Sequence, residues 1–330
     1  MDKKPDFNEN LWGLADLAPR LDMAAEANAL LRGQANQEIE GVAEEVREEN
    51  GVTVHIITVL NEKGAARLNR QPGRYITIDI PLEDEEDDIG EIAKVVAGQL
   101  KNLLRTAPSV AHPLLIVGLG NDNAIPDALG PRVVDMSYAT RHLFHLHNLE
   151  GYSAVCAVAP GVLENSGIET AEIIDGICEH IHPSALIVVD SLAAASISRV
   201  GTTIQVCETG IRPGSGLGKR RSGIDSTMTG CPVIAIGVPT VVDTAAIIAE
   251  TLTSLGQYWR GRAMIVPPQL DDAAYSYAEK QLLERFRGRL VVTPKDIDDL
   301  IARDAEIIAA AIAMMAHPAA TKDNYHNFLR

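Results

Sequence analysis

Three continuous apolar runs stand at the centre of the chain, and each ends in glycine or aspartate. The runs are Leu114–Gly120, Ala185–Asp190 and Pro232–Gly237. Such runs are typical of strands in a parallel sheet that is buried on both faces. Helical patterns lie between and after them, at Leu129–His145, Glu169–His180 and Asp243–Trp259. This alternation predicts an α/β fold with a doubly wound, mostly parallel sheet flanked by helices.

Shorter patterns precede this core. The segment Gln37–Glu49 has apolar positions at helical spacing and predicts a helix. Val52–Leu60 and Arg74–Ile80 are rich in β-branched residues and predict a strand pair joined by a turn-rich connection. Ile89–Arg105 then predicts an amphipathic helix. The N-terminal part is therefore expected to add strands to the core.

The remaining patterns lie toward the C-terminus. Thr202–Glu208 predicts one more strand, with an antiparallel orientation left open. Leu290–Pro294 predicts a short strand, and Asp296 marks the start of a long helix rich in Ala and Ile. The tail after His317 is polar and is expected to be frayed. A C-terminal helix thus completes the predicted architecture.

The composition excludes some classes of protein. The 330 residues carry a formal net charge of −16, which argues against direct binding of nucleic acid. The polar N-terminus lacks the apolar segment of a signal peptide, and no apolar run reaches membrane-spanning length. The four cysteines form no C-x-x-C pair, and no H-E-x-x-H motif occurs, so neither a metal nor another cofactor is predicted. These features favour a cytoplasmic protein without membrane contact.

Carboxylates follow the central apolar runs. Asp127, Asp190 and Asp243 each come at or soon after the end of a predicted strand, and ligands of such sheets bind beyond the carboxyl ends of the strands. Two close carboxylates cannot both ionise cheaply, so one can activate water while the other, protonated, polarises a carbonyl. The simpler alternative is that each Asp caps the following helix, and this is the preferred interpretation of Asp243.

Two glycine-rich turns partly match the motifs of nucleotide-binding loops. The turn that begins at Gly118 has Asn123 where the dinucleotide fingerprint needs glycine, and Thr209–Arg221 has Arg220 where a phosphate loop needs Ser or Thr. Backbone N–H groups that face a peptide or an oxyanion are more consistent with these sequences. The candidate residues for this role are Asn121, Gly214, Ser215 and Gly216.

Five longer stretches carry a family resemblance. They are Val117–Phe144, Ala159–Ile174, Thr202–Arg221, Cys231–Thr244 and Val291–Asp298. In this order they resemble the germination protease of endospore-forming bacteria, whose fold is similar to that of hydrogenase-maturation endopeptidases. The resemblance implies a homotetrameric endopeptidase of the forespore and spore core that degrades small acid-soluble spore proteins. It also implies synthesis as a zymogen that cleaves itself near the N-terminus.

The resemblance assigns roles to individual residues. The family's two essential aspartates match Asp127 in P-D-A-L-G-P and Asp190 in V-V-D-S-L-A, which implies aspartic-type attack by water. The family cuts after an acidic residue that precedes a large apolar one, so A-D-L-A predicts self-cleavage between Asp16 and Leu17. Residues 1–16 would then be a propeptide, and 17–330 a single α/β peptidase domain with its core at about 110–260.

The chain departs from the family pattern at two places near the predicted site. Asp122 stands where an aromatic residue is frequent, and Ser196 stands where arginine is common. These changes leave open a different substrate preference or an inactive paralogue. The alternatives to the main interpretation are a metal-dependent endopeptidase of the hydrogenase-maturation type and a non-catalytic protein that binds spore proteins.

Overall fold

A mixed nine-stranded sheet organises the protein. The computed structural model describes residues 22–35, 39–81, 89–104, 107–145, 149–211, 223–261, 277, 281 and 290–330. The strand order is β1-β2-β3-β7-β8-β6-β4-β5, and β9 pairs with β8. The strands are β1 (Val42–Glu49), β2 (Val52–Val59), β3 (Gly73–Asp79), β4 (Leu114–Gly118), β5 (Val155–Val158), β6 (Ala185–Ala194), β7 (Thr203–Cys207), β8 (Val233–Asp243) and β9 (Val291–Val292).

Parallel pairing is confined to one part of this sheet. The neighbours β5, β4, β6 and β8 run parallel to one another, while β1, β2, β3, β7 and β9 are joined by antiparallel pairs. The α/β class, the added N-terminal strands and the C-terminal helix are confirmed. The sheet is mixed rather than mostly parallel, because β7 joins the antiparallel N-terminal strands to β8. The orientation of β7, left open from the sequence, is antiparallel.

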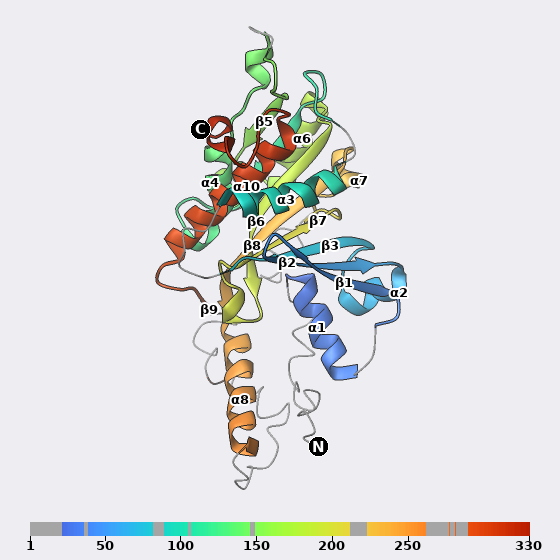
Figure 1. Ribbon diagram of the computed structural model, residues 1–330, viewed down its shortest axis with the longest axis vertical. Coiled ribbons are helices and arrows are strands. Elements are labelled where there is room, and N and C mark those ends of the chain that lie inside the picture. The colour runs from blue at the N-terminus through green and yellow to red at the C-terminus, as the bar shows by residue number, and fades with distance from the viewer. Residues whose placement is uncertain are drawn as a thin grey trace.

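Helices cover both faces of the sheet. The helices are α1 (Ala24–Ala35), α2 (Glu62–Leu68), α3 (Ile89–Leu103), α4 (Leu129–Met136), α5 (Leu163–Ser166), α6 (Thr170–Ile181), α7 (Ser226–Thr229), α8 (Thr244–Gly261) and α10 (Ile297–Ala316). The main core lies under α3, α4 and α10, of which α3 and α10 pack side by side (Figure 1). The opposite face carries one cluster under α6 and another under α1.

The continuous apolar runs form strands that are buried on both faces of the sheet, as expected from the sequence. In β4, Leu114 and Ile116 belong to the core under α3 and α10, whereas Leu115 and Val117 belong to the cluster under α6. Successive side chains of a strand point to opposite faces, so a strand buried on both sides must be apolar at every position. Leu186 and Ile187 divide between the two faces in the same way.

Three expectations about the elements are wrong. The predicted helix Gln37–Glu49 contains β1, which pairs along its whole length with β2 and exposes its charged side chains as an edge strand. The connection before β3 holds α2, which begins after its N-cap Asn61. The tail after His317 is packed rather than frayed, since Tyr325 and Phe328 are each 5% exposed.

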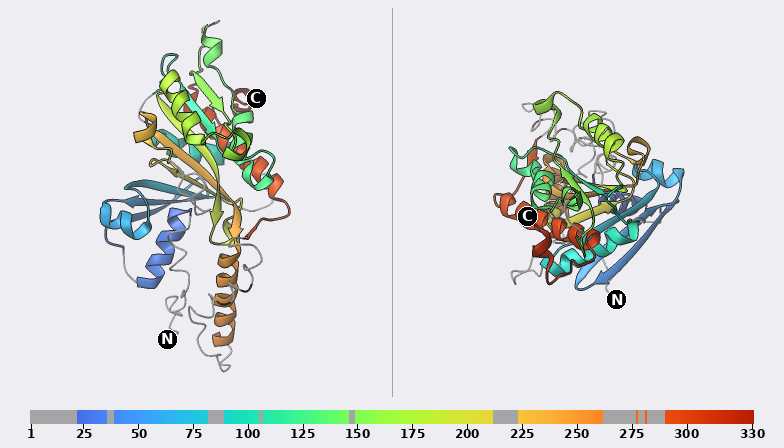
Figure 2. Two further views of the ribbon diagram at one scale, coloured as in Figure 1. Left: turned by 180° about the vertical axis from the view of Figure 1, so that it is seen from behind. Right: turned by 90° about the horizontal axis from the view of Figure 1, so that it is seen from above.

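Two strands run further than their apolar patterns indicate. β6 continues past Asp190 to Ala194, and β8 continues past Gly237 to Asp243. The two strands stay paired over this extension, with a register shift between Leu192 and Ala193. Helix α8 follows β8 directly and projects from one end of the sheet in both side views (Figures 1 and 2). Asp190 is therefore inside a strand, not at its end.

Candidate active site

Asp127 lies in a tight turn at the carboxyl end of β4. The turn ends in the 3-10 helix η2 (Ile125–Asp127). The Asp127 N–H donates to the Ala124 carbonyl (2.7 Å), and the Asn121 N–H donates to the Asp127 carbonyl (3.0 Å). These bonds fold the ten residues after β4 back over its end. Asn121, expected to bind substrate, here also positions the backbone of Asp127.

Gly120 makes this turn possible. Its φ of +114° is in the region that only glycine adopts readily. A methyl group in place of its hydrogen would overlap the Asp127 carbonyl oxygen and would lie 3.2 Å from the carboxyl carbon of Asp127. The backbone of Gly120 therefore packs directly against the candidate catalytic residue.

A threonine from β8 holds the same turn from another side. Thr240 is 1% exposed, and its hydroxyl donates to the Pro126 carbonyl (2.6 Å). Its own carbonyl accepts from the Thr293 hydroxyl (2.9 Å). The sequence pattern gives no sign of this role for Thr240, because nothing in it shows that β8 reaches the turn after β4.

Asp190 lies on β6 beside the end of β4. The last pair between these strands joins Gly118 to Val189, and the Leu119 N–H donates to the Val189 carbonyl (2.8 Å). Asp190 comes one residue later and pairs with Gly237 of β8. Helix η2 contacts both β6 and β8. The structure thus brings the Asp127 turn and Asp190 to the same end of β4, as expected.

The environment of Asp190 can be read from the strand alternation. Leu186 and Val188 face the cluster under α6, so the Asp190 side chain belongs to that face of the sheet. Asp190 is half-buried, and its Oδ1 accepts from the Ser191 N–H (2.9 Å). This bond orients the carboxylate along the edge of β6.

The candidate oxyanion loop starts and ends on the same face. Ile211 and Ile224 bond to each other through both N–H and carbonyl groups, at 3.0 and 2.8 Å, and both pack in the cluster that contains Val188. Gly214, Ser215 and Gly216 lie between them, outside the described residues. Asp16 and Leu17, the predicted self-cleavage residues, also lie outside the described part of the chain.

Asp243 does not join the other two aspartates. It is the last residue of β8, six positions after the Gly237 that pairs with Asp190, and it pairs with Val291 of β9. Six residues of strand correspond to about 20 Å. The expectation that three carboxylates approach one edge is wrong for Asp243, because β8 continues well past its apolar run.

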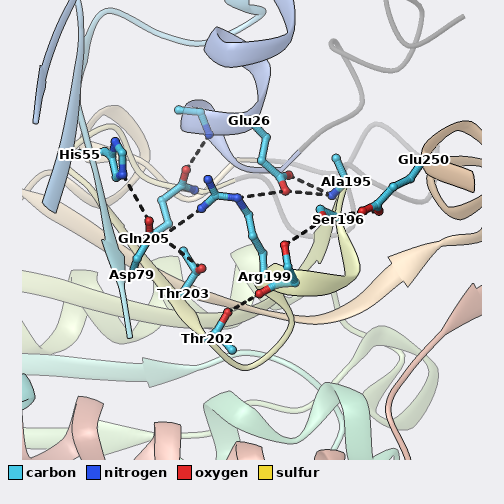
Figure 3. A network of polar contacts seen from close by, with 12 residues as sticks. Glu26, His55, Asp79, Ala195, Ser196, Arg199, Thr202, Thr203, Gln205 and Glu250 are labelled. Atoms are coloured by element: carbon cyan, nitrogen blue, oxygen red, sulfur yellow. Dashed lines mark hydrogen bonds and ion pairs between the residues drawn. The ribbon is translucent and has the colours of Figure 1, made fainter. Parts of the chain in front are cut away.

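A polar network that the sequence did not indicate lies between α1 and the end of β6 (Figure 3). Glu26 of α1 is 7% exposed and accepts from the Ala195 N–H at 3.1 and 3.0 Å. Arg199 lies 3.6 Å from Glu26 and donates to Asp79 (3.1 Å). His55 lies 3.2 Å from the other oxygen of Asp79. These residues come from α1, β2, β3 and the segment that follows β6, so no local motif encodes them.

Burial dominates the electrostatics of Glu26. It raises the pKa of Glu26 to about 7, although the Ala195 N–H and the Arg199 charge act in the opposite direction. Asp22, which precedes α1, raises the pKa further. Glu26 therefore changes its charge near neutral pH.

Neither a cluster of metal ligands nor a helix that could cross a membrane is present among the described residues. Within the described ranges, no group of three or more His, Cys, Asp or Glu side chains could hold a metal ion. Among the described helices, none is both long and apolar enough to cross a membrane.

Comparison with known proteins places the chain in a family. A model of a peptidase family described as germination protease matches residues 20–284. The germination protease of Clostridium acetobutylicum is 42% identical over 249 residues, 73% of this chain and 76% of that protein. The germination protease of Clostridium perfringens is 38% identical over 322 residues, 94% of this chain and 98% of that protein.

A solved structure shows a weaker likeness. The crystal structure of a NiFe hydrogenase maturation protease from Thermococcus kodakarensis covers 65% of this chain and 98% of its own, with 16% sequence identity and a TM-score of 0.29. The family model and the sequence relatives show that the chain is a peptidase and belongs to the germination protease family.

Proposed function

We propose that this peptidase hydrolyses small acid-soluble spore proteins during germination, with Asp127 and Asp190 as its catalytic pair. The observation that carries the proposal is the placement of both residues at the carboxyl end of β4, where open α/β sheets bind ligands. The family membership supports a protease that acts in germination.

The proposed chemistry needs one ionised and one protonated carboxyl group. The ionised carboxylate takes a proton from water as the oxygen attacks the scissile carbonyl, and the protonated carboxyl donates to the carbonyl oxygen. The tetrahedral intermediate collapses when the first carboxyl gives the proton that it took from water to the amide nitrogen, the carbon–nitrogen bond breaks, and the second carboxylate takes back its proton from the oxygen. The Asn121 backbone N–H already donates to the Asp127 carbonyl, so the backbone N–H groups of Gly214, Ser215 and Gly216 would stabilise the negative charge that develops on the oxygen.

The same proposal covers maturation and assembly. We propose that residues 1–16 are a propeptide that the enzyme removes between Asp16 and Leu17, that 17–330 form the peptidase domain, and that the active form is a cytoplasmic homotetramer in the spore core. The intact mass of the protein after incubation under activating conditions shows whether the cut occurs at this bond. An N-terminus beginning at another residue would contradict the assignment of Asp16.

The decisive experiment measures hydrolysis of a purified small acid-soluble spore protein. Asp127→Asn and Asp190→Asn each remove one proton-transfer group without changing its size, so each should lower kcat by about 10³-fold. Asp135→Asn is the matched control, because Asp135 is exposed on α4, one helix after Asp127. It should leave kcat unchanged.

Two outcomes would overturn the proposal. If either active-site variant keeps near-normal activity while its unfolding transition matches that of the wild type, the pair is not catalytic. If a chelator abolishes wild-type activity and a divalent ion restores it, a metal-dependent mechanism replaces the aspartic-type one.

A further inference from the structure

Beyond the end of β4, no strand among the described residues pairs with the edge of β6 that faces β4. The Val189 carbonyl accepts from the Leu119 N–H, which shows that Val189 faces the β4 side. Alternate residues of a strand direct their N–H groups to the same edge, so Ser191 and Ala193 follow on that side, and Ala195 comes one residue past the end of β6. β4 ends at Gly118 and supplies no partner there. We call the N–H groups of Ala193 and Ala195 the open edge.

Carboxylates occupy these positions in place of a strand. The Ala193 N–H donates to Asp22 Oδ2 (3.0 Å). Figure 3 shows the Ala195 N–H, which donates to both oxygens of Glu26. Asp22 lies two residues before α1, and Glu26 lies in the first turn of the helix. Their two carboxylates therefore take the place of two carbonyl groups of a neighbouring strand.

The open edge leads directly to the candidate catalytic residue. The Ser191 N–H, next in the same series, donates to Asp190 Oδ1 (2.9 Å). Ala193 is three residues past Asp190, a distance of about 10 Å along a strand. An extended chain paired with Ala193 and Ala195 would therefore bring a bond two or three residues away to the Asp190 carboxylate.

Helix α1 is attached in a way that permits exchange. The fully or nearly buried apolar side chains within α1 are Ala24, Ala25 and Ala27, which bury little apolar area; Met23, just before the helix, is fully buried, and Leu31 packs in part against the sheet. Its polar attachments include the bond from the Ala24 N–H to Gln205 (2.7 Å). Glu26 pays a desolvation cost as a buried carboxylate, whereas a neutral peptide carbonyl could accept the same N–H group without burying a charge.

We propose that the open edge is a binding site for the extended backbone of a protein substrate, which adds as a strand beside β6, and that α1 occupies the site in this structure. Main-chain bonds would supply affinity, as they do wherever a peptide extends the edge of a sheet. The inference rests on the proposed function, since Asp190 must be catalytic for a peptide on this edge to be cut. Asp22 and Glu26 then act as internal competitors of the substrate.

The test measures binding without cleavage. In the Asp190→Asn protein, the probe is a fluorescein-labelled small acid-soluble spore protein, and anisotropy gives its Kd. Asp22→Ala/Glu26→Ala should tighten binding by about tenfold, because the site no longer has to be vacated. The control Glu172→Ala/Glu179→Ala removes two exposed carboxylates from α6 and makes the same change in net charge. It should leave Kd unchanged.

Amide exchange reports on the edge itself. In the Asp22→Ala/Glu26→Ala protein, the amides of Ala193 and Ala195 should exchange faster than in the parent and slow again when the probe is added. Ala195→Pro in that protein should reverse the gain in affinity, because proline has no N–H, whereas Ala195→Gly should keep it.

The result can overturn the inference independently of the proposed function. If the double variant binds no more tightly than its α6 control, or if the probe leaves both amides unprotected, the open edge does not bind substrate and α1 is a fixed part of the fold. Failure of the proposed function would appear elsewhere, as retained hydrolysis by Asp190→Asn.

Discussion

The turn that carries Asp127 and the attachment of α1 are built in opposite ways. The turn is held mainly by backbone bonds among residues 121–128, with Gly120 at the one position that needs a positive φ. The α1 attachment is held by side chains that bond to backbone groups 169 to 181 residues away. Hydrogen bonds between neighbouring residues make a rigid turn, and a short sequence motif can encode it. Hydrogen bonds from carboxylates to a distant segment can be replaced by bonds to another chain, and no short motif encodes them.

Gly120→Ala is the strongest way to break the turn. The added methyl group would overlap the Asp127 carbonyl and require a strained φ, so we expect a stability loss of about 2–3 kcal/mol and at least a 100-fold loss of kcat. Hydrolysis and urea unfolding measure the two effects.

Gly98→Ala is the control for this change. A methyl group at Gly98 meets no atom within 4 Å, and the residue lies inside α3. Alanine should there stabilise the protein by up to about 1 kcal/mol and leave activity intact. Normal activity in Gly120→Ala would show that the turn tolerates rearrangement and would weaken the contrast between the two regions.

The α1 attachment should respond to pH where the turn does not. Glu26 has a pKa of about 7 in the folded protein, above its usual value of 4.5, so its contribution favours the folded state at low pH. Stability should fall as pH rises from about 4.5 through 7, by up to about 3 kcal/mol from this group. The measurement is the free energy of unfolding as a function of pH.

Glu26→Gln should remove part of that pH dependence. Asp304, buried in α10 with its pKa raised to about 7 mainly by burial, contributes in the same direction and stays in both proteins. The matched change at exposed Glu172 should leave the curve as in the wild type. If the free energy of unfolding depends on pH in the same way for Glu26→Gln and the wild type, then ionisation of buried Glu26 does not affect the stability of the α1 attachment.

Thr240→Val is the smallest and most local test. It deletes the hydroxyl that donates to Pro126 but keeps the shape, so the Pro126 carbonyl loses its partner at a cost of about 1 kcal/mol. Loosening the turn should lower kcat about tenfold with little change in KM. Thr251→Val, which removes an exposed hydroxyl that donates to the Ile247 carbonyl (2.7 Å), should change neither.

Some features of the fold could be predicted because their causes are local. The apolar runs of β4, β6 and β8 require burial on both faces, and Ile89–Leu103 shows the periodicity of α3. Because Asp127 and Asp190 each follow an apolar run that forms a strand, the sequence also predicts that they lie near the same edge of the sheet. β1 was missed because its apolar spacing is helical, and its pairing with β2 overrides that preference.

The sequence by itself determined the parallel core, the family and the positions of Asp127 and Asp190 near the ends of apolar runs. Each of these features depends on residues that are consecutive in the chain. Only the tertiary structure decided that β6 and β8 run on past their apolar patterns, that Thr240 supports the Asp127 turn, and that α1 covers the open edge. These features depend on which distant segments meet. Register and helix docking are set by packing of the whole sheet, and no single stretch of residues records them.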